Sequence, residues 1–178
     1  MKGIVFTEFF EMVEKQFGYS MVDELVESTP LHSKGIYTAV GTYDHQEMVS
    51  LVVELSQRTQ IPIPDLLKAF GRYLFQTFTK SYHHFFANAP DAFTFLSFIH
   101  NYIHVEVKKL YPDAELPHFD IEHPSPNQLI MNYRSTRKMA NLALGLIEGT
   151  FEFYHEAATI QFDKLSDDGS EVRFIITK

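Results

Sequence analysis

The sequence predicts an α+β fold, in which a helical N-terminal lobe packs on a C-terminal lobe of a small antiparallel sheet and one inserted helix. Two observations point to this class. Apolar residues recur at helical spacing through most of residues 2–110. Apolar residues then alternate with polar ones in residues 119–133 and 159–177, which is the period of a strand with one buried face.

The length and composition fit one domain with a sizeable core. The chain has 178 residues, and 45% of them are hydrophobic, so we expect a single domain over residues 1–178. The change from helical to alternating spacing suggests two lobes, of about residues 1–60 and 61–178, with an uncertain boundary between them.

Composition also excludes several classes of function. The chain has no cysteine, which rules out disulfides, iron–sulfur clusters, thiolate zinc sites and a cysteine nucleophile. The net charge of −8, without a run of Lys and Arg, argues against a nucleic-acid partner. No stretch approaches the roughly 20 apolar residues that cross a membrane. The first residues lack the apolar centre of a signal peptide, so we expect a cytoplasmic protein.

The first lobe is predicted from helical spacing and one strand. Residues 2–17 place Phe6, Phe9 and other apolar side chains on one helical face. A second short helix is expected at residues 21–26. The segment Gly35-Ile36-Tyr37-Thr38-Ala39-Val40-Gly41 reads as a β-strand between glycines.

Two further helices follow, and their start signals are clear. Asp44 is expected to cap a helix that runs to about Arg58, with Glu47 completing a capping box. Pro64-Asp65 starts the next helix. Gly71 lies in its middle, where glycine costs about 1 kcal/mol relative to alanine. Either a ligand or another helix approaching closely would explain that glycine.

A long helix is expected from Pro90-Asp91 to about Leu110, and it carries two histidines. At about 100° per residue, His100 lies near the centre of the buried face and His104 at its edge. Their i,i+4 spacing allows both to reach one metal ion. Zinc needs four ligands, however, and no third ligand has a recognisable spacing.

The rest of the chain predicts the sheet and its inserted helix. Strands are expected at residues 119–122 and 128–133, joined by a turn. A helix then runs from about residue 136 to 155. Residues 159–165 and 171–177 form a final hairpin.

Five residues at the end of the second predicted strand form the motif Tyr133-Arg134-Ser135-Thr136-Arg137. In an extended chain Tyr133, Ser135 and Arg137 share one face, in a row of about 13 Å. Two hydroxyl groups and a guanidinium suit a ligand with two separated anionic groups. The alternative is a solvated strand end followed by a helix cap at Ser135 or Thr136.

A buried histidine among many aromatic residues suggests a particular ligand. The chain has 17 Phe and nine Tyr, enough to line a pocket for a large flat molecule. A single imidazole is how many proteins hold haem iron with the opposite face open. The two propionates of haem would match the hydroxyl and guanidinium row. A histidine that is simply part of the core is the more common case.

Several motifs together resemble the H-NOX family, the haem nitric oxide/oxygen-binding domains that include the haem domain of soluble guanylate cyclase. The chain starts Met1-Lys2-Gly3-Ile4-Val5, and Phe70-Gly71 lies mid-helix. A histidine stands seven residues before Tyr111-Pro112, and Leu116-Pro117-His118-Phe119 follows. The Tyr-x-Ser-x-Arg motif at residues 133–137 completes the series. These motifs cover nearly the whole chain in the family's order.

The resemblance selects between the two histidines. The position seven residues before Tyr-Pro makes His104 the proximal ligand of haem b, bound between the lobes. His100 then becomes a residue of the core beside it, although periodicity alone favours His100 for burial.

The same resemblance assigns the rest of the haem contacts. Tyr133, Ser135 and Arg137 are implied to bind the propionates. Pro117 is implied to pack against the macrocycle and to help distort it.

On the distal side, the resemblance implies a pocket that discriminates against O2. In O2-binding members, a tyrosine on the helix after the motif donates a hydrogen bond to O2; here that place is Leu142. Phe9 and Leu74 stand where those members have Trp and Asn. Losing a hydrogen bond of about 1.5–3 kcal/mol weakens O2 roughly 10- to 150-fold. The expected distal lining is Val5, Phe9, Leu74, Phe78, Leu142 and Leu146.

The resemblance therefore implies a sensor of nitric oxide, with CO as a weaker ligand and O2 excluded. With no catalytic domain in the chain, we expect a separate partner: a histidine kinase, or a diguanylate cyclase or phosphodiesterase. One alternative is a haem peroxidase or oxygenase, but that chemistry needs a distal acid–base group. Another is a haem-free adaptor or lipid-binding module that holds an acyl chain in the aromatic pocket.

Overall fold

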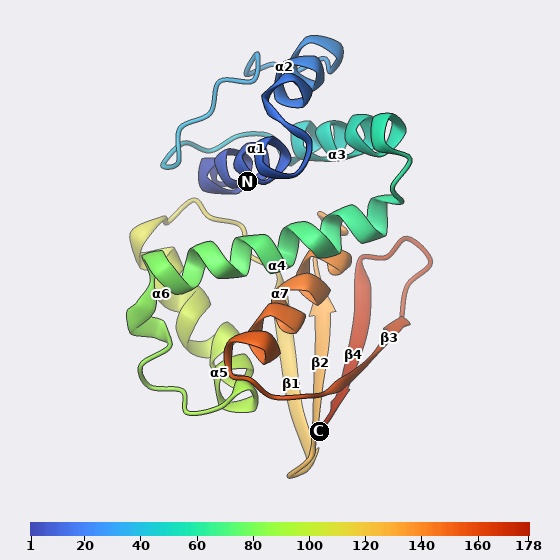
Figure 1. Cartoon of the computed structure of the whole chain (residues 1–178). Helices are drawn as coiled ribbons and strands as arrows, with labels where there is room; N and C mark the ends of the chain where they lie inside the picture. The colour runs from blue at the N-terminus through green and yellow to red at the C-terminus, as the bar shows by residue number, and fades with distance from the viewer.

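The computed structural model describes all residues 1–178 and confirms the α+β fold (Figure 1). Four antiparallel strands lie in the order β1-β2-β4-β3. Helices α1 to α3 form a layer at one end, and α4 and α7 lie between that layer and the sheet. The elements are α1 Gly3–Phe17, α2 Tyr19–Ser28, α3 His45–Thr59, α4 Ile63–Ser81, α5 Ala92–Phe98, α6 His104–Leu110, β1 His118–Ser125, β2 Gln128–Arg134, α7 Ala140–Phe153, β3 Thr159–Lys164 and β4 Glu171–Thr177.

Two apolar cores hold these layers together. One joins α1, α2, α3 and α4, with Phe6, Phe9 and Phe70 fully buried at its centre. The other joins the inner face of the sheet to α5 and α7, around Met131 and Phe174. None of the helices combines the length and apolar character that a bilayer crossing requires.

The strand expected at Gly35–Gly41 is wrong. The segment forms turns, and its carbonyls instead cap α1: Gly41 accepts from the N–H of Gly3 at 2.8 Å, and Ala39 from that of Ile4 at 3.0 Å. The first N–H groups of a helix have no hydrogen-bond acceptor within the helix, so the carbonyls of this loop serve as their acceptors. Ile36 and Val40 are exposed, so only Tyr37 of this segment packs against the core.

The start of α3 has the Asp44 cap of the predicted capping box but not the return contact from Glu47. The Asp44 side chain accepts a hydrogen bond from the N–H of Gln46 at 2.9 Å, as expected of a cap. Glu47 does not turn back to Asp44. Its buried carboxylate accepts from the Ser33 N–H at 3.1 Å, the Ser33 hydroxyl at 2.5 Å and the Tyr37 hydroxyl at 2.6 Å. Glu47 therefore fixes the loop before α3 rather than the helix end.

Helices α4 and α7 cross at two glycines. A Cβ atom on Gly71 would lie 2.3 Å from the carbonyl oxygen of Leu142, and one on Gly145 would lie 2.1 Å from that of Lys68. Real Cβ atoms do not approach so closely. Of the two explanations for Gly71, the close approach of another helix is therefore the correct one.

The long helix predicted from residue 90 contains an irregularity that the spacing does not reveal. Between α5 and α6, residues Ile99–Ile103 form a π turn. A π turn accommodates an extra residue without completing an extra turn. Counting 100° per residue through it therefore misplaces every side chain beyond residue 98.

The C-terminal half has the predicted hairpins, but its helix begins later than predicted. Strands β1 and β2 are joined at Pro126-Asn127, and β3 pairs with β4. Helix α7 starts at Ala140 rather than near residue 136. Lys138 has a φ of 55°, a left-handed conformation that a helix cannot include. The preceding residues therefore form a turn, and neither Ser135 nor Thr136 caps the helix.

Candidate functional site

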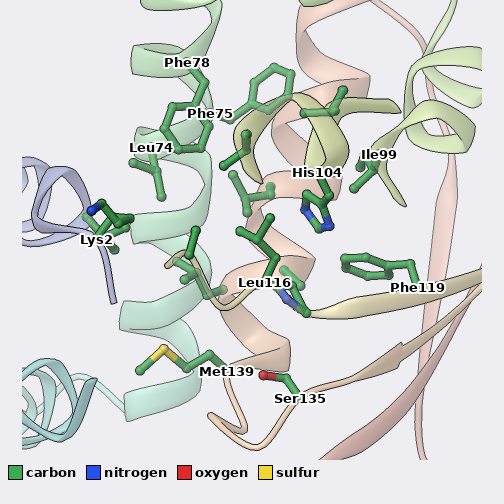
Figure 2. A pocket seen from close by; sticks show the side chains of 18 of the residues that line it. Lys2, Leu74, Phe75, Phe78, Ile99, His104, Leu116, Phe119, Ser135 and Met139 are labelled. Atoms are coloured by element: carbon green, nitrogen blue, oxygen red, sulfur yellow. The ribbon is translucent and has the colours of Figure 1, made fainter. Parts of the chain in front are cut away.

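The main cavity lies where the helical layer, α4, α6, α7 and the end of β2 meet (Figure 2). Of the 34 residues that line it, 25 are hydrophobic. The cavity brings together all but one of the residues that the sequence analysis expected to contact haem. They are Val5, Leu74, Phe78, His104, Pro117, Tyr133, Ser135, Arg137, Leu142 and Leu146.

Phe9 is the exception, and its expected place in the lining is wrong. Its side chain is fully buried in the core of the helical layer, and its ring packs edge-on against Phe70 at 5.3 Å. Val5 lies one turn earlier on the same helix and does reach the cavity. Helix α1 therefore contributes Ile4 and Val5 to the pocket, while Phe6 and Phe9 pack into the core.

His104 is the first residue of α6, directly after the π turn. Figure 2 shows its ring among the lining side chains, across the pocket from Leu74 and Phe78 on α4. Burial lowers the pKa of its imidazole to about 4, and the nearby His100 adds to this, while a backbone contact from Pro117 opposes it. Its Nδ1 atom is buried without a hydrogen bond of good geometry. The ring is therefore neutral at pH 7, and its other nitrogen, Nε2, makes no hydrogen bond and can take a ligand.

His100 has a different environment, contrary to the periodicity. Its ring packs edge-on against that of His118, with ring centres 4.2 Å apart, and its Nδ1 accepts from the Phe119 N–H at 3.5 Å. It does not line the cavity. No group of three or more His, Asp or Glu residues is arranged to hold a metal ion, so the pair of histidines is not a zinc site.

The Tyr-x-Ser-x-Arg residues converge on one end of the cavity, although not as a straight row. Strand β2 ends at Arg134, and the turn after it brings Ser135 and Arg137 beside Tyr133. The Tyr133 hydroxyl accepts from the Met139 N–H at 3.1 Å, and the Ser135 hydroxyl from the Arg137 N–H at 3.2 Å. Burial raises the pKa of the Tyr133 phenol, which stays a neutral donor.

Arg137 holds the charge at this end of the cavity. One terminal nitrogen donates to the carboxylate of Glu115 at 3.0 Å, and Glu115 itself is largely exposed. The Nε of Arg137 is buried with no partner. A buried donor without an acceptor is costly, so this guanidinium is available to an anionic ligand that enters the cavity.

Sequence reasoning missed a second polar group in the lining. Lys2, Thr42, Tyr111 and Asp113 meet at another edge of the cavity, where Figure 2 shows Lys2. Tyr82, at the end of α4, also lines the cavity, and burial followed by the neighbouring Tyr111 raises the pKa of its phenol. Lys2 and Tyr111 fall inside motifs quoted above, but nothing in the pattern marked them as neighbours.

The residues present suit haem. The walls are apolar and wide, as a porphyrin requires. One neutral imidazole reaches into the cavity with an unpartnered nitrogen, which is the donor that haem iron takes. A buried guanidinium and two hydroxyl groups at one end match carboxylates. Fold and site together define a haem-pocket protein of the α+β class.

Comparison with known families then identifies the family. The family model described as Haem-NO-binding matches residues 2–162, which is most of the chain. The protein therefore belongs to the haem-NO-binding, or H-NOX, family of haem-based gas sensors, and haem b is the cofactor of that family. A search of curated proteins found no match.

Solved structures agree over almost the full length. The unliganded Fe(II) H-NOX protein from K. algicida is 45% identical, with a TM-score of 0.96 over 100% of this chain and 96% of that one. The Fe(II)NO H-NOX protein from S. oneidensis is 31% identical, with a TM-score of 0.88 over 99% and 98%. The IWP-051-bound Fe(II)CO H-NOX from Shewanella woodyi is 42% identical, with a TM-score of 0.86 over 100% and 94%.

Proposed function

We propose that this protein senses nitric oxide with ferrous haem b, binds CO more weakly and excludes O2. The wall opposite His104 carries the proposal, because it offers no hydrogen-bond donor. Its lining from α1, α4 and α7 includes Val5, Leu74, Phe78, Leu142 and Leu146. The Thr150 hydroxyl on α7 already donates to the Leu146 carbonyl at 2.9 Å.

Each proposed role follows from the surroundings of the residue. When bound, haem supplies an iron that takes diatomic gases on the face opposite its protein ligand. His104 is the proposed iron ligand, because it is neutral and its ring has an unpartnered nitrogen. Tyr133, Ser135 and Arg137 would hold the propionates, and Pro117 would press on the macrocycle from the wall that carries His104.

Selectivity in this proposal comes from what the distal wall lacks. O2 depends on a nearby donor more than nitric oxide does, because it acquires more negative charge on ferrous iron. A hydrogen bond to such a group is worth about 1.5–3 kcal/mol, and leaving it out weakens binding roughly 10- to 150-fold. The absence of an acid–base group on the same wall also argues against peroxidase or oxygenase chemistry.

The signal is proposed to pass to another protein in the cytoplasm. A histidine kinase, a diguanylate cyclase or a phosphodiesterase fits a sensor of this size, which we treat as one domain over residues 1–178 with lobes of about 1–60 and 61–178. Signalling requires that the partner binds the two ligand states with different affinity. The NO-bound structure from S. oneidensis supports nitric oxide as the ligand in a relative.

An optical experiment tests the proposal. Purified protein loaded with haem is reduced under nitrogen and then exposed separately to nitric oxide, CO and air. We expect spectral shifts with nitric oxide and CO, and no stable oxygenated spectrum in air. A stable oxygenated spectrum would refute the selectivity. Tyr82→Phe is the matched control, because Tyr82, just after α4, brings a hydroxyl group to the cavity lining and should not alter this result.

A further inference from the structure

One edge of the cavity is closed by three polar side chains from distant parts of the sequence. The ammonium of Lys2 donates to the Thr42 hydroxyl at 2.7 Å and lies 3.5 Å from the carboxylate of Asp113. The Thr42 hydroxyl in turn donates to Asp113 at 2.5 Å. All three residues line the cavity. We call this group the Lys2–Thr42–Asp113 clasp.

The two sides of the clasp belong to different parts of the molecule. Lys2 and Thr42 are bridged through their backbones just before α1 and α3, in the helical layer. Asp113 lies in the link that follows α6, the helix that begins with His104. Other side-chain contacts of the layer, such as Lys15–Tyr73 and Glu8–Thr77, reach only α4. The clasp is thus the polar connection between the layer and the segment that follows His104.

The clasp is shielded on one side only: the Lys2 side chain is largely buried, whereas that of Asp113 is 57% exposed. The Lys2 side chain is only 14% exposed, and its ammonium lies 4.9 Å from the centre of the Tyr111 ring. The Thr42 hydroxyl first, and then Lys2, hold the pKa of the Asp113 carboxyl below its ordinary value. A charge that is largely removed from water loses much of its favourable energy when its partner leaves.

We propose that the Lys2–Thr42–Asp113 clasp holds the helical layer against the segment that follows His104, and that it controls how readily the cavity opens to release haem. Opening this edge moves Asp113 away from Lys2 and Thr42, so both hydrogen bonds must break first. The inference needs haem in the cavity. It does not depend on which gas binds.

Two substitutions test the clasp with little change in shape. Thr42→Val removes the hydroxyl, and Asp113→Asn removes the charge. Haem transfer from the ferric protein to excess apomyoglobin should be about 3- to 10-fold faster in each variant. The double variant should be hardly faster than either single one, since both break the same connection. Glu106→Gln is the control, because it removes a carboxylate from α6 that pairs only with Lys109 on the same helix.

A haem-free measurement separates the clasp from haem affinity. In the apoprotein, amide hydrogen exchange at Gly3 and Ile4, whose N–H groups bond to the loop before Thr42, should be faster in both variants than in the control. Transfer and exchange rates equal to those of Glu106→Gln would overturn the proposal. A wild-type protein that takes up no haem would instead contradict the haem function, while the exchange result would still decide the clasp.

Because the chain has no cysteine, a single engineered disulfide can be used to hold the clasp closed reversibly. The double variant Thr42→Cys/Asp113→Cys should form a disulfide under oxidation, because these two side chains touch. Haem transfer should then be slower than in the wild type and should recover with dithiothreitol. Transfer that stays at the wild-type rate once the disulfide has formed would contradict the proposed clasp.

Discussion

The two walls of the cavity treat polar groups in opposite ways. On the wall from α1, α4 and α7, the lining is apolar and the Thr150 hydroxyl is bonded within its own helix. On the other wall, His104 Nδ1 and Arg137 Nε are buried with no partner. Leaving such a group unsatisfied costs about 1–3 kcal/mol. The comparison indicates that one wall keeps an imidazole and a guanidinium for a ligand, while the facing wall is apolar.

The largest test removes the imidazole from the polar wall. His104→Gly should abolish the Soret absorption of haem-loaded protein, because no other imidazole lines the cavity. Added imidazole should restore the absorption by filling the space. His100→Gly is the matched control and should keep its haem, since His100 lies outside the cavity. The opposite result for the two variants would reverse the assignment of the histidines.

The next test makes the apolar wall polar. Leu142→Tyr places a phenol on α7 where the lining now has only carbon. Its hydroxyl should strengthen O2 binding roughly 10- to 150-fold, the range of one hydrogen bond to a charged group. Spectral titration with O2 measures the effect, and Leu142→Phe controls for the added ring. Equal O2 affinity in the Tyr and Phe variants would show that the wall excludes O2 by shape.

A smaller effect is expected at the propionate end. Arg137→Met keeps most of the side-chain volume and removes the guanidinium, while Tyr133 and Ser135 remain. Haem transfer to apomyoglobin should be about 10-fold faster, which corresponds to roughly 1.4 kcal/mol. Arg134→Met is the control, since Arg134 pairs with the exposed Asp120 at 2.6 Å and does not line the cavity. If both variants accelerate transfer equally, net charge rather than contact explains the result.

The sequence predicted most of the fold because most of it is regular. The hairpins followed the alternation of apolar residues, and Gly71 correctly marked a close approach. Periodicity failed at His100 because the π turn just before His104 breaks the angular count. It failed at Gly35–Gly41 because those carbonyls cap α1 instead of pairing with a strand.

Only some of the site residues could be predicted, because contacts between distant parts of the chain leave no local pattern in the sequence. His104 and the Tyr-x-Ser-x-Arg residues were found from spaced motifs shared with a family, not from local pattern. Phe9 does not line the cavity because it packs in the core together with Phe6, whereas Val5 lies at the cavity. Lys2 and Asp113 were missed because residues 111 positions apart leave no local signal of their contact.

The smallest expected effect concerns a buried charge that is fully satisfied, in contrast to Arg137. Burial acts to raise the pKa of the Glu47 carboxyl, but hydrogen bonds from Ser33 and Tyr37 outweigh it and hold the pKa below its usual value. A carboxyl with a depressed pKa stabilises the fold above the unfolded pKa and loses that contribution as the pH falls through the folded one.

Glu47→Gln should therefore lower the unfolding free energy of the apoprotein by about 1 kcal/mol at pH 7. At an acidic pH below the depressed folded pKa of Glu47 the wild type also carries a protonated carboxyl, so the difference between the two proteins should shrink as the pH falls. Urea denaturation at both pH values measures this. Glu14→Gln, at an exposed site on α1, should show no such change. A difference that is the same at both pH values would mean that shape, not charge, sets the contribution of Glu47.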